Sequence, residues 1–428
     1  MTLQTQSPSA PSNPPNIATT TPSLTRQDAE QAAIKHNPNI SVAALLARAQ
    51  AEHVRVTRSS LFPDLSGAVT GVDAEEASRI STGSLTASRL LYHAGAGVRL
   101  DQLITDFGRT RNLIDSSSFE AKAADQRSQA TRDDIVLATD NAFYRALRAQ
   151  ATLTVAESTV KTRKDVADQV SAMTASKLKS TLDQSFAQVN LSQAQLFKLD
   201  AQNEYEAAIA SLNELLGTTT DTHYRLVDDP APPQPISPTV EAVIALALQQ
   251  RPDLIALADT HEADVRFAKA QHDQLFPTIS GLGVVGITPI ASKQYFVTNW
   301  YGAAGVNISI PIFNGFKFHS EATEAKLHAN ASDEQHRALV DQIVRDVRTA
   351  WLTSQSAQRR MAVSAQLLKQ ANSALDLATT RYQLGLSSIV ELSQAQLQQT
   401  QAQIDNANAR FEYEQDLAAL RFESGSQP

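Results

Sequence analysis

The pattern of apolar and polar positions from Phe316 to Gly425 predicts two long antiparallel helices joined by a single turn. The segment is rich in Ala, Gln, Leu, Arg and Asp, contains no proline, and has one internal glycine, Gly385. Because glycine adopts the backbone conformation of a helix end at little cost, we expect the turn in the Gly-Leu-Ser-Ser stretch that begins there. At 1.5 Å per residue, the roughly 68 residues before the turn form a rod on the order of 100 Å long. A rod of this length indicates a protein that spans a distance.

A second pair of long helices is predicted earlier in the chain, at about residues 109–176 and 178–216. Apolar residues on the first of these helices follow a 3-4 spacing and most are alanine, which predicts a coiled-coil seam with closely approaching helices. The seam positions are Ile135, Ala138, Ala142, Ala146, Ala149, Leu153, Ala156 and Val160.

Two shorter helices are predicted before this pair, at residues 24–36 and 38–61. Asn37-Pro38 provides an N-cap and a first helical residue, and Phe62-Pro63 ends the second helix because the residue before a proline avoids helical geometry. That second helix and the return helix at residues 178–216 together match the length of the long helix. We therefore expect the two to stack end to end beside it.

Strict alternation of apolar and polar residues predicts β-strands between the helices. Residues 278–288 and 299–312 flank a turn-rich loop around Pro289, and residues 64–72 and 92–104 flank a longer loop. Each strand is about as long as the 9–11 residues that a tilted membrane-spanning strand needs. Four strands cannot close a barrel that leaves a channel, so we expect an oligomer to contribute its hairpins together. The clearest alternation is Gly305, Asn307 and Ser309 against Val306, Ile308 and Ile310.

The two halves of the chain repeat each other. Pro38 and Pro63 are 25 residues apart, as are Pro252 and Pro277. From Gly97 onward the halves stay in step at an offset of 208, and the offset changes only between Pro63 and Gly97, where the first half is six residues longer. A duplication of about 200 residues is the simplest interpretation. Matching positions include Gly97 and Gly305, Phe143 and Trp351, Tyr205 and Tyr413, and Gly217 and Gly425.

Composition narrows the class of protein. The chain of 428 residues is 42% apolar but only 6% aromatic, which favours closely packed long helices over a globular core of large side chains. A net charge of −8 without a basic run argues against nucleic-acid binding. The chain contains no cysteine, which excludes disulfides and thiolate chemistry. No apolar run approaches a membrane helix, and the first residues lack the apolar core of a signal peptide, so we expect an exported protein to have lost its signal.

No motif predicts catalysis, a cofactor or a metal site. Gly281-x-Gly283-x-x-Gly286 has the spacing of a dinucleotide-binding loop, but Thr288-Pro289 follows it instead of a helix, so small residues in a barrel strand are the simpler interpretation. Paired carboxylates, a nucleophile with a base, and a phosphate loop are all lacking. We therefore expect neither enzymatic activity nor a cofactor. The helical histidines His319, His328 and His336 have spacings that do not converge on a metal ion.

The order and spacing of these features resemble the TolC-like outer-membrane efflux protein family. The resemblance covers roughly residues 24–425 and includes the Asn-Pro and Phe-Pro helix boundaries, Asp106-Phe107-Gly108-Arg109 at the start of a long helix, and Arg381-Tyr382-x-x-Gly385-Leu386 at a tip. It implies a mainly α protein with a β-barrel part: long antiparallel coiled-coil hairpins form an α-barrel, and two β-hairpins per chain give four strands to a trimeric, twelve-stranded outer-membrane barrel.

The expected organisation along the chain follows from the repeat and the resemblance. Each repeat combines short helices, a β-hairpin and a helical hairpin. The expected parts are a flexible lead-in at residues 1–23, repeat 1 at 24–217 with its β-hairpin at about 64–105 and its helical hairpin at 109–216, a linker at 218–238, and repeat 2 at 239–425 with its β-hairpin at about 278–312 and its helical hairpin at 316–424.

The resemblance also assigns roles at the helical tips. Tyr382 matches the tyrosine that helps to hold a closed iris, Asp183 matches its acidic partner on the first hairpin, and Glu391 falls among the acids that line the constriction. We hypothesise a Tyr382–Asp183 hydrogen bond that favours closure. The alternatives are that Tyr382 simply packs in the tip and that Glu391 is an ordinary exposed acid. The residues expected to contact an adaptor protein are Lys177, Leu178, Gly385, Leu386 and Ser387.

The tips also depart from the family pattern. Gln394 stands where a second acid is expected, and Ser387 where an arginine is expected. In the first repeat, Lys177 occupies the tip glycine position and Thr174 the tyrosine position. These differences predict a weaker ring of acids and a less constrained iris.

The favoured function is an exit duct in the outer membrane, with the helical part in the periplasm. It passively conducts substrates for a tripartite efflux or type I secretion system after docking a periplasmic adaptor. The expected partners are two further copies of the chain, outer-membrane lipid, the adaptor (membrane fusion) protein and, through it, an inner-membrane pump. The alternative is a non-channel structural or adhesive coiled-coil rod, but a rod has no use for two alternating β-hairpins. A periplasmic adaptor is a third candidate, although it needs one helical hairpin inside a β-rich domain rather than two.

Overall fold

The structure is a computed structural model that describes residues 22–73, 80–82, 85–88, 92–218, 222–228, 239–287 and 300–426. Most of the expected lead-in, most of the expected linker and the loop around Pro289 lie outside these residues. The helices are α1 (Arg26–His36), α2 (Pro38–Ser59), α3 (Arg109–Ala175), α4 (Thr181–Leu215), α5 (Val240–Gln250), α6 (Pro252–Asp273), α7 (Lys317–Gln383) and α8 (Ile389–Glu423). The strands are β1 (Ser23–Leu24), β2 (Asp64–Asp73), β3 (Ile80–Thr82), β4 (Leu85–Ser88), β5 (Tyr92–Thr105), β6 (Arg225–Leu226), β7 (Thr278–Ile287) and β8 (Trp300–Ser309).

Corresponding helices of the two halves have equal lengths. Helices α3 and α7 have 67 residues each, and α4 and α8 have 35 each. The shorter helices also match, at 22 residues for α2 and α6 and 11 for α1 and α5. Equal lengths are expected of duplicated helices that pack along a shared seam, because an insertion would shift every later contact.

Several element boundaries differ from the sequence-based expectation. Helix α1 begins at Arg26 rather than at residue 24, because Leu24 pairs in a short parallel ladder with Leu226. Helix α4 begins at Thr181 rather than at residue 178, because Ser180 caps it through a hydrogen bond from the backbone N–H of Asp183. Helix α2 ends at Ser59, two residues before the expected end, and β8 ends three residues early, at Ser309. Part of the expected loop at residues 73–91 forms the antiparallel pair β3–β4.

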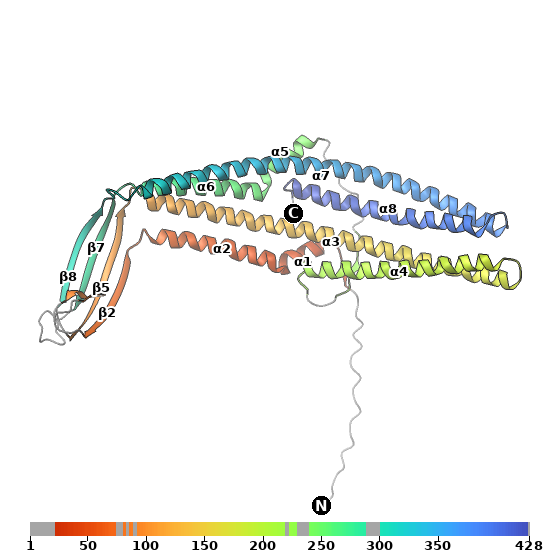
Figure 1. Cartoon of the computed structure of the whole chain (residues 1–428), viewed down its shortest axis with the longest axis horizontal. Helices are drawn as coiled ribbons and strands as arrows, with labels where there is room; N and C mark the ends of the chain where they lie inside the picture. Colours follow the sequence, from red (N-terminus) through yellow and green to blue (C-terminus); the bar gives the residue numbers. More distant parts are fainter. Residues whose placement is uncertain are drawn as a thin grey trace, which may run out of the picture. The chain divides into compact units, whose positions relative to one another are not determined.

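The chain divides into two compact units, and each takes segments from both repeats. The tip unit consists of residues 1–36, 138–234 and 360–415. The sheet unit consists of residues 37–137, 235–359 and 416–428. Figure 1 shows α3, α7 and α8 as continuous helices, so each of them contributes residues to both units.

The tip unit contains two helical hairpins. In the first hairpin, α4 returns along α3, with Lys198 Nζ 3.1 Å from Glu157 Oε1. In the second, α8 returns along α7, and the amide of Gln399 donates to Asn372 at 3.2 Å. Alanine is the most frequent buried residue along these helices, in line with the predicted seam, and its small side chain allows the helices to approach closely.

The sheet unit is built on one antiparallel sheet with the strand order β2-β5-β7-β8 (Figure 1). Strands β2 and β5 pair over ten residues, as do β7 and β8. Helix α6 contacts α3 on one side, where Arg127 donates to Thr260 at 2.6 Å. On its other side it contacts α7, where the His261 ring nitrogen lies 3.0 Å from the carbonyl oxygen of Ala329. Helix α5 packs on α7 through a cluster that includes Val243, Ala247, Ile343 and Val347.

The two helical tips end in the same backbone motif with different residues. Gly385 has a φ of 73°, and Lys177, at the equivalent position of the first repeat, has a φ of 60°. In both turns the next residue, Leu178 or Leu386, donates its N–H at 2.8 Å to a carbonyl five residues earlier. This left-handed conformation favours glycine, so Lys177 is strained where Gly385 is not.

We predict that Lys177→Gly raises the free energy of unfolding by about 0.5–1 kcal/mol, because relief of the left-handed strain exceeds the entropy that glycine adds to the unfolded chain. Denaturant titration measures the change. The matched variant is Gly385→Ala, expected to lose about 1 kcal/mol through the backbone alone, since no atom lies within 4 Å of the added Cβ. A Lys177→Gly variant no more stable than the parent would contradict the assignment of strain.

Candidate functional site

The four-stranded sheet has one apolar face and one polar face. Alternation along each strand and the register between strands place large apolar side chains on a single side, and most of them are exposed in the isolated chain. Exposed apolar surface of this extent is typical of a surface that contacts a partner or lipid. The residues on this face include Leu65, Val69, Val98, Leu100, Ile279, Val285, Ile287, Trp300, Val306 and Ile308.

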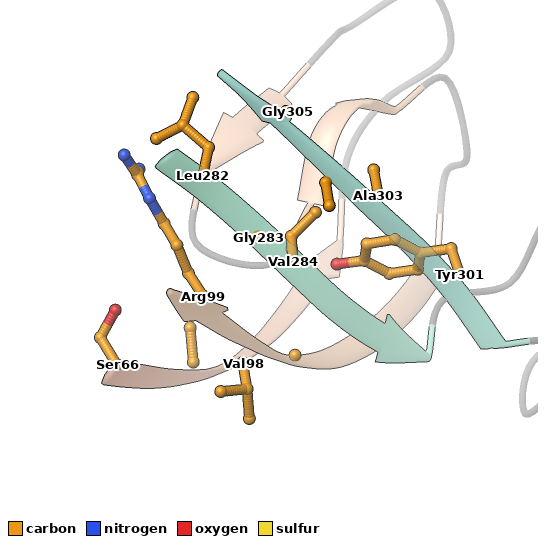
Figure 2. A pocket seen from close by; sticks show the side chains of 12 residues that line it. Ser66, Val98, Arg99, Leu282, Gly283, Val284, Tyr301, Ala303 and Gly305 are labelled. Carbon is orange, nitrogen blue, oxygen red and sulfur yellow. The ribbon is translucent and has the colours of Figure 1, made fainter. Parts of the chain in front are cut away.

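The opposite face is lined mainly by small and polar residues, together with Leu282 and Val284, and is hollowed to about 770 Å³. Figure 2 shows Arg99 and Val98, neighbours on β5, on opposite sides of the sheet. Arg99 Nε lies 2.7 Å from Asp101 Oδ2, two residues along the same face. One face thus has ion-paired side chains, and the other has exposed Val and Ile side chains. This arrangement is typical of strands that separate water from hydrocarbon. The residues that line the hollow include Ser66, Ala68, Arg99, Val284, Tyr301 and Ala303.

The tips of the two helical hairpins share an apolar cluster. It takes residues from all four helices of the two hairpins, and its member Tyr382 is 4% exposed. The Nζ of Lys179 lies 4.3 Å from the centre of the Tyr382 ring, on which it makes a cation–π contact. The remaining members are Ala167, Val170, Ala187, Leu191, Ile389 and Leu392.

The hypothesised Tyr382–Asp183 hydrogen bond is absent, which corrects that expectation. The Tyr382 hydroxyl is buried and has no hydrogen-bond partner among the described residues. Asp183 Oδ2 instead accepts from the backbone N–H of Ser180 at 3.2 Å and from its hydroxyl at 2.9 Å, forming a capping box. Burial, and to a smaller extent the nearby Asp183 charge, raise the pKa of Tyr382. Tyr382 therefore contributes its ring to the tip, while its hydroxyl is unsatisfied.

Glu391 is the counterpart of Asp183 in the second repeat and has a different partner. Its backbone N–H donates to Ser388 Oγ at 3.3 Å, so both acids lie in the first turn of a helix, where the helix dipole favours negative charge. The Glu391 carboxylate, however, lies 3.5 Å from Arg381 Nε on α7. Both side chains are about half exposed, so the pair is accessible to water and ions. Sequence reasoning missed Arg381, although it precedes Tyr382 in the tip motif.

The sequence-predicted tip residues lie at the two turns. Leu178 and Leu386 are 74% and 67% exposed, which is unusual for leucine. Ser387 has a buried hydroxyl without a hydrogen-bond partner among the described residues. Gln394, expected to be an acid in the family pattern, is exposed. The first tip contacts the second through the shared cluster and through Lys179, whose Nζ lies over the Tyr382 ring.

Other candidate chemistry is not supported. Within the described part of the chain, no group of three or more His, Asp or Glu side chains is arranged to hold a metal ion. None of the described helices is both long and apolar enough to cross a membrane.

The fold and these faces define a protein with long helical hairpins and an antiparallel sheet that has one apolar and one polar face. The model of the outer membrane efflux protein family matches residues 30–218 and 243–426, so the chain belongs to that family. It is 23% identical over 420 residues to the outer membrane protein TolC of Escherichia coli, covering 90% of this chain and 82% of that protein. It is 22% identical over 372 residues to the probable efflux pump outer membrane protein TtgC of Pseudomonas putida, covering 86% of this chain and 75% of that one. The structure of the outer-membrane channel OprN superposes with a TM-score of 0.81 at 20% identity, covering 94% of this chain and 90% of that chain.

These comparisons confirm the predicted resemblance to TolC-like efflux proteins. The chain is an outer-membrane efflux channel of mainly helical structure with a small sheet. Members of this family are channels rather than enzymes.

The two faces of the sheet predict losses of stability of different size for the same substitution. Val284 and Val285 are adjacent on β7 and lie on the polar and apolar faces respectively. Val285→Lys is expected to cost about 2–4 kcal/mol, because it places a charge among apolar side chains on the face that we expect to contact lipid. Val284→Lys enters the hollow and is expected to cost less than about 1 kcal/mol, even with Arg99 on the neighbouring strand. Denaturant unfolding in lipid measures both, and equal losses would contradict the assignment of the faces.

Proposed function

We propose that three copies of this chain assemble into an outer-membrane channel that serves as the exit duct of a tripartite efflux or type I secretion system. The duct conducts substrates passively and performs no catalysis. Its helical hairpins extend into the periplasm, where their tips dock an adaptor protein that connects the channel to an inner-membrane pump. The observation that carries the proposal is the two-faced sheet, because a rod or an adaptor has no use for it.

The sheet supports closure by copies of the same chain. Its outer strands, β2 and β8, each have one edge that pairs with no other described strand. Long unpaired edges are a liability that proteins cover or close. Neighbouring strands alternate in direction across an even number of strands, so β2 of one copy continues the antiparallel pattern beside β8 of the next. Three copies then give a twelve-stranded barrel with the apolar face outward and the hollowed face toward the lumen.

The repeats give this assembly its internal symmetry. We place repeat 1 at residues 24–217 and repeat 2 at residues 239–425, each with a β-hairpin and a helical hairpin. The equal helix lengths and the separate matches of the family to residues 30–218 and 243–426 support the division.

The helical tips are the proposed gate. The ring of Tyr382 holds the second hairpin against the first through the apolar cluster that they share. Asp183 fixes the start of α4 and so positions the first tip, whereas Glu391 and its partner Arg381 are exposed where ions would pass. The gate therefore depends on packing and on a partly neutralised acid, rather than on a tyrosine hydrogen bond.

The same tips carry the proposed adaptor contact. Leu178 and Leu386 project an exposed apolar side chain from each turn, beside Lys177, Gly385 and Ser387. An apolar pair with a neighbouring cation is suited to a protein partner. Because the two turns have the same backbone, each chain offers two similar contacts to the adaptor.

The assembly prediction is direct. The detergent-solubilised complex is expected to have a protein mass three times the 46.3 kDa of one chain and to form conducting pores in planar bilayers. Mass photometry or native mass spectrometry measures the first property, and single-channel recording the second. A stable, water-soluble monomer obtained without detergent would contradict the proposal.

The Arg381–Glu391 pair predicts opposite shifts in ion preference. Glu391→Gln removes the negative charge and is expected to lower the preference for cations over anions, whereas Arg381→Gln leaves Glu391 unneutralised and should raise it. Reversal potentials under a salt gradient measure both. A shift of the same sign in the two variants would show that neither residue faces the ion path.

A further inference from the structure

A buried arginine joins the two helical hairpins close to their tips. Arg163 of α3 is 8% exposed, and its Nη1 donates to Oε1 of Gln396 on α8, which is 5% exposed. In the part of the chain that the structure describes, no carboxylate forms an ion pair with Arg163. Burial lowers the pKa of Arg163. A guanidinium is too basic to lose its proton even so. The site therefore holds a full positive charge, and the group that compensates it is the neutral amide of Gln396.

The pair adjoins the tip cluster. Arg163 precedes Ala167 by one helical turn, and Gln396 follows Leu392 by one turn, so the pair lies at the end of the cluster away from the turns. Three residues before Gln396, Ser393 Oγ accepts from the Asn190 amide at 2.8 Å. Both hydrogen bonds run from the first hairpin to the second. They are broken if the hairpins separate.

The second repeat shows that packing alone does not require this charge. Ala371 occupies the position equivalent to Arg163 at the offset of 208, and it too is buried. The helices of the second hairpin therefore pack with an alanine at the equivalent position. An arginine there introduces a desolvation cost that alanine avoids, and an amide oxygen compensates a cation less than a carboxylate does.

We propose that Arg163 and Gln396 form a weak latch that sets how readily the hairpins separate at the tips. Separation returns the guanidinium to water and so favours the open arrangement, while the Gln396 carbonyl opposes it. Both act as positioning residues, because they hold the hairpins and need not touch a substrate. This inference rests on the proposed channel function for its consequence, but the latch itself is a property of the hairpins.

The latch predicts that some substitutions favour closure of the hairpins and others favour their separation. Gln396→Glu supplies the missing countercharge and should hold the hairpins together. Gln396→Met removes the acceptor, leaves a buried unpaired cation and should drive them apart. Arg163→Met, alone or with Gln396→Met, removes the charge and should favour closure again. A residue that served packing alone would loosen the tips whichever partner was truncated.

The first experiment records single channels of the full-length protein in planar bilayers. We expect Gln396→Glu and Arg163→Met to lower the open probability about tenfold and Gln396→Met to raise it about tenfold, changes that correspond to about 1.4 kcal/mol each. The control is Gln398→Glu, which adds the same charge to an exposed position of α8 and should not alter the open probability.

The second experiment measures the hairpins without relying on conduction. The chain contains no cysteine, so Asn190→Cys with Ser393→Cys introduces a single pair across the hydrogen-bonded contact between hairpins. A short thiol-reactive cross-linker closes a loop of about 200 residues within the chain, which a denaturing gel detects by faster migration. Cross-linking should be faster than in the parent pair with Gln396→Glu and slower with Gln396→Met.

The outcomes separate the two proposals. A parent that conducts no current overturns the channel function, while the cross-linking rates still test the latch. Cross-linking rates that are the same in all variants, or that fall equally with Arg163→Met and Gln396→Met, overturn the latch. A Gln396→Met chain that fails to assemble is replaced by the double variant, whose return to closed behaviour the latch requires and simple packing forbids.

Discussion

The edges of β2 and β8 that pair with no other described strand are the constraint on which the rest of the architecture depends. A strand edge cannot remain bare in hydrocarbon, because each unsatisfied backbone group costs several kcal/mol there. The sheet has an apolar face of the kind that suits lipid, and its four strands are too few to close on themselves. In the proposed assembly, closure therefore comes from other copies. Because each β-hairpin continues into helices, the same copies also set how many helical hairpins meet at the tips.

The spacing of apolar residues and the positions of proline and glycine made most of this architecture predictable from the sequence. A run without proline and with a single glycine at Gly385 indicated a long hairpin, and Phe62-Pro63 placed a helix end to within a few residues. Alternation at Val306 and Ile308 indicated which face of β8 is apolar. Each of these signals is local, in that the residues that produce the structure are neighbours in the chain. The family resemblance followed from their order.

Features that depend on distant residues were not predictable. Leu24 lies in a strand only because Leu226 is beside it, and the two residues of β1 have no period to detect. Arg163 and Gln396 are 233 positions apart, and neither belongs to a motif. The hypothesised Tyr382–Asp183 bond failed for a related reason: Asp183 is used by Ser180, three residues away. A local hydrogen bond at a helix start needs little additional ordering, so it competes well with a distant partner.

The duplication clarifies what the tips add to the fold. Equal helix lengths mean that the two hairpins are interchangeable as packing units, so differences between equivalent residues are not needed to build them. Three such differences lie near the tips: Lys177 against Gly385, Thr174 against Tyr382, and Arg163 against Ala371. Two of the three destabilise the first hairpin: Lys177 has a left-handed backbone conformation, and Arg163 is a buried cation. At the equivalent positions the second hairpin has Gly385, which adopts the left-handed conformation at little cost, and Ala371, which buries no charge. Both destabilising features therefore lie in the first hairpin and neither lies in the second.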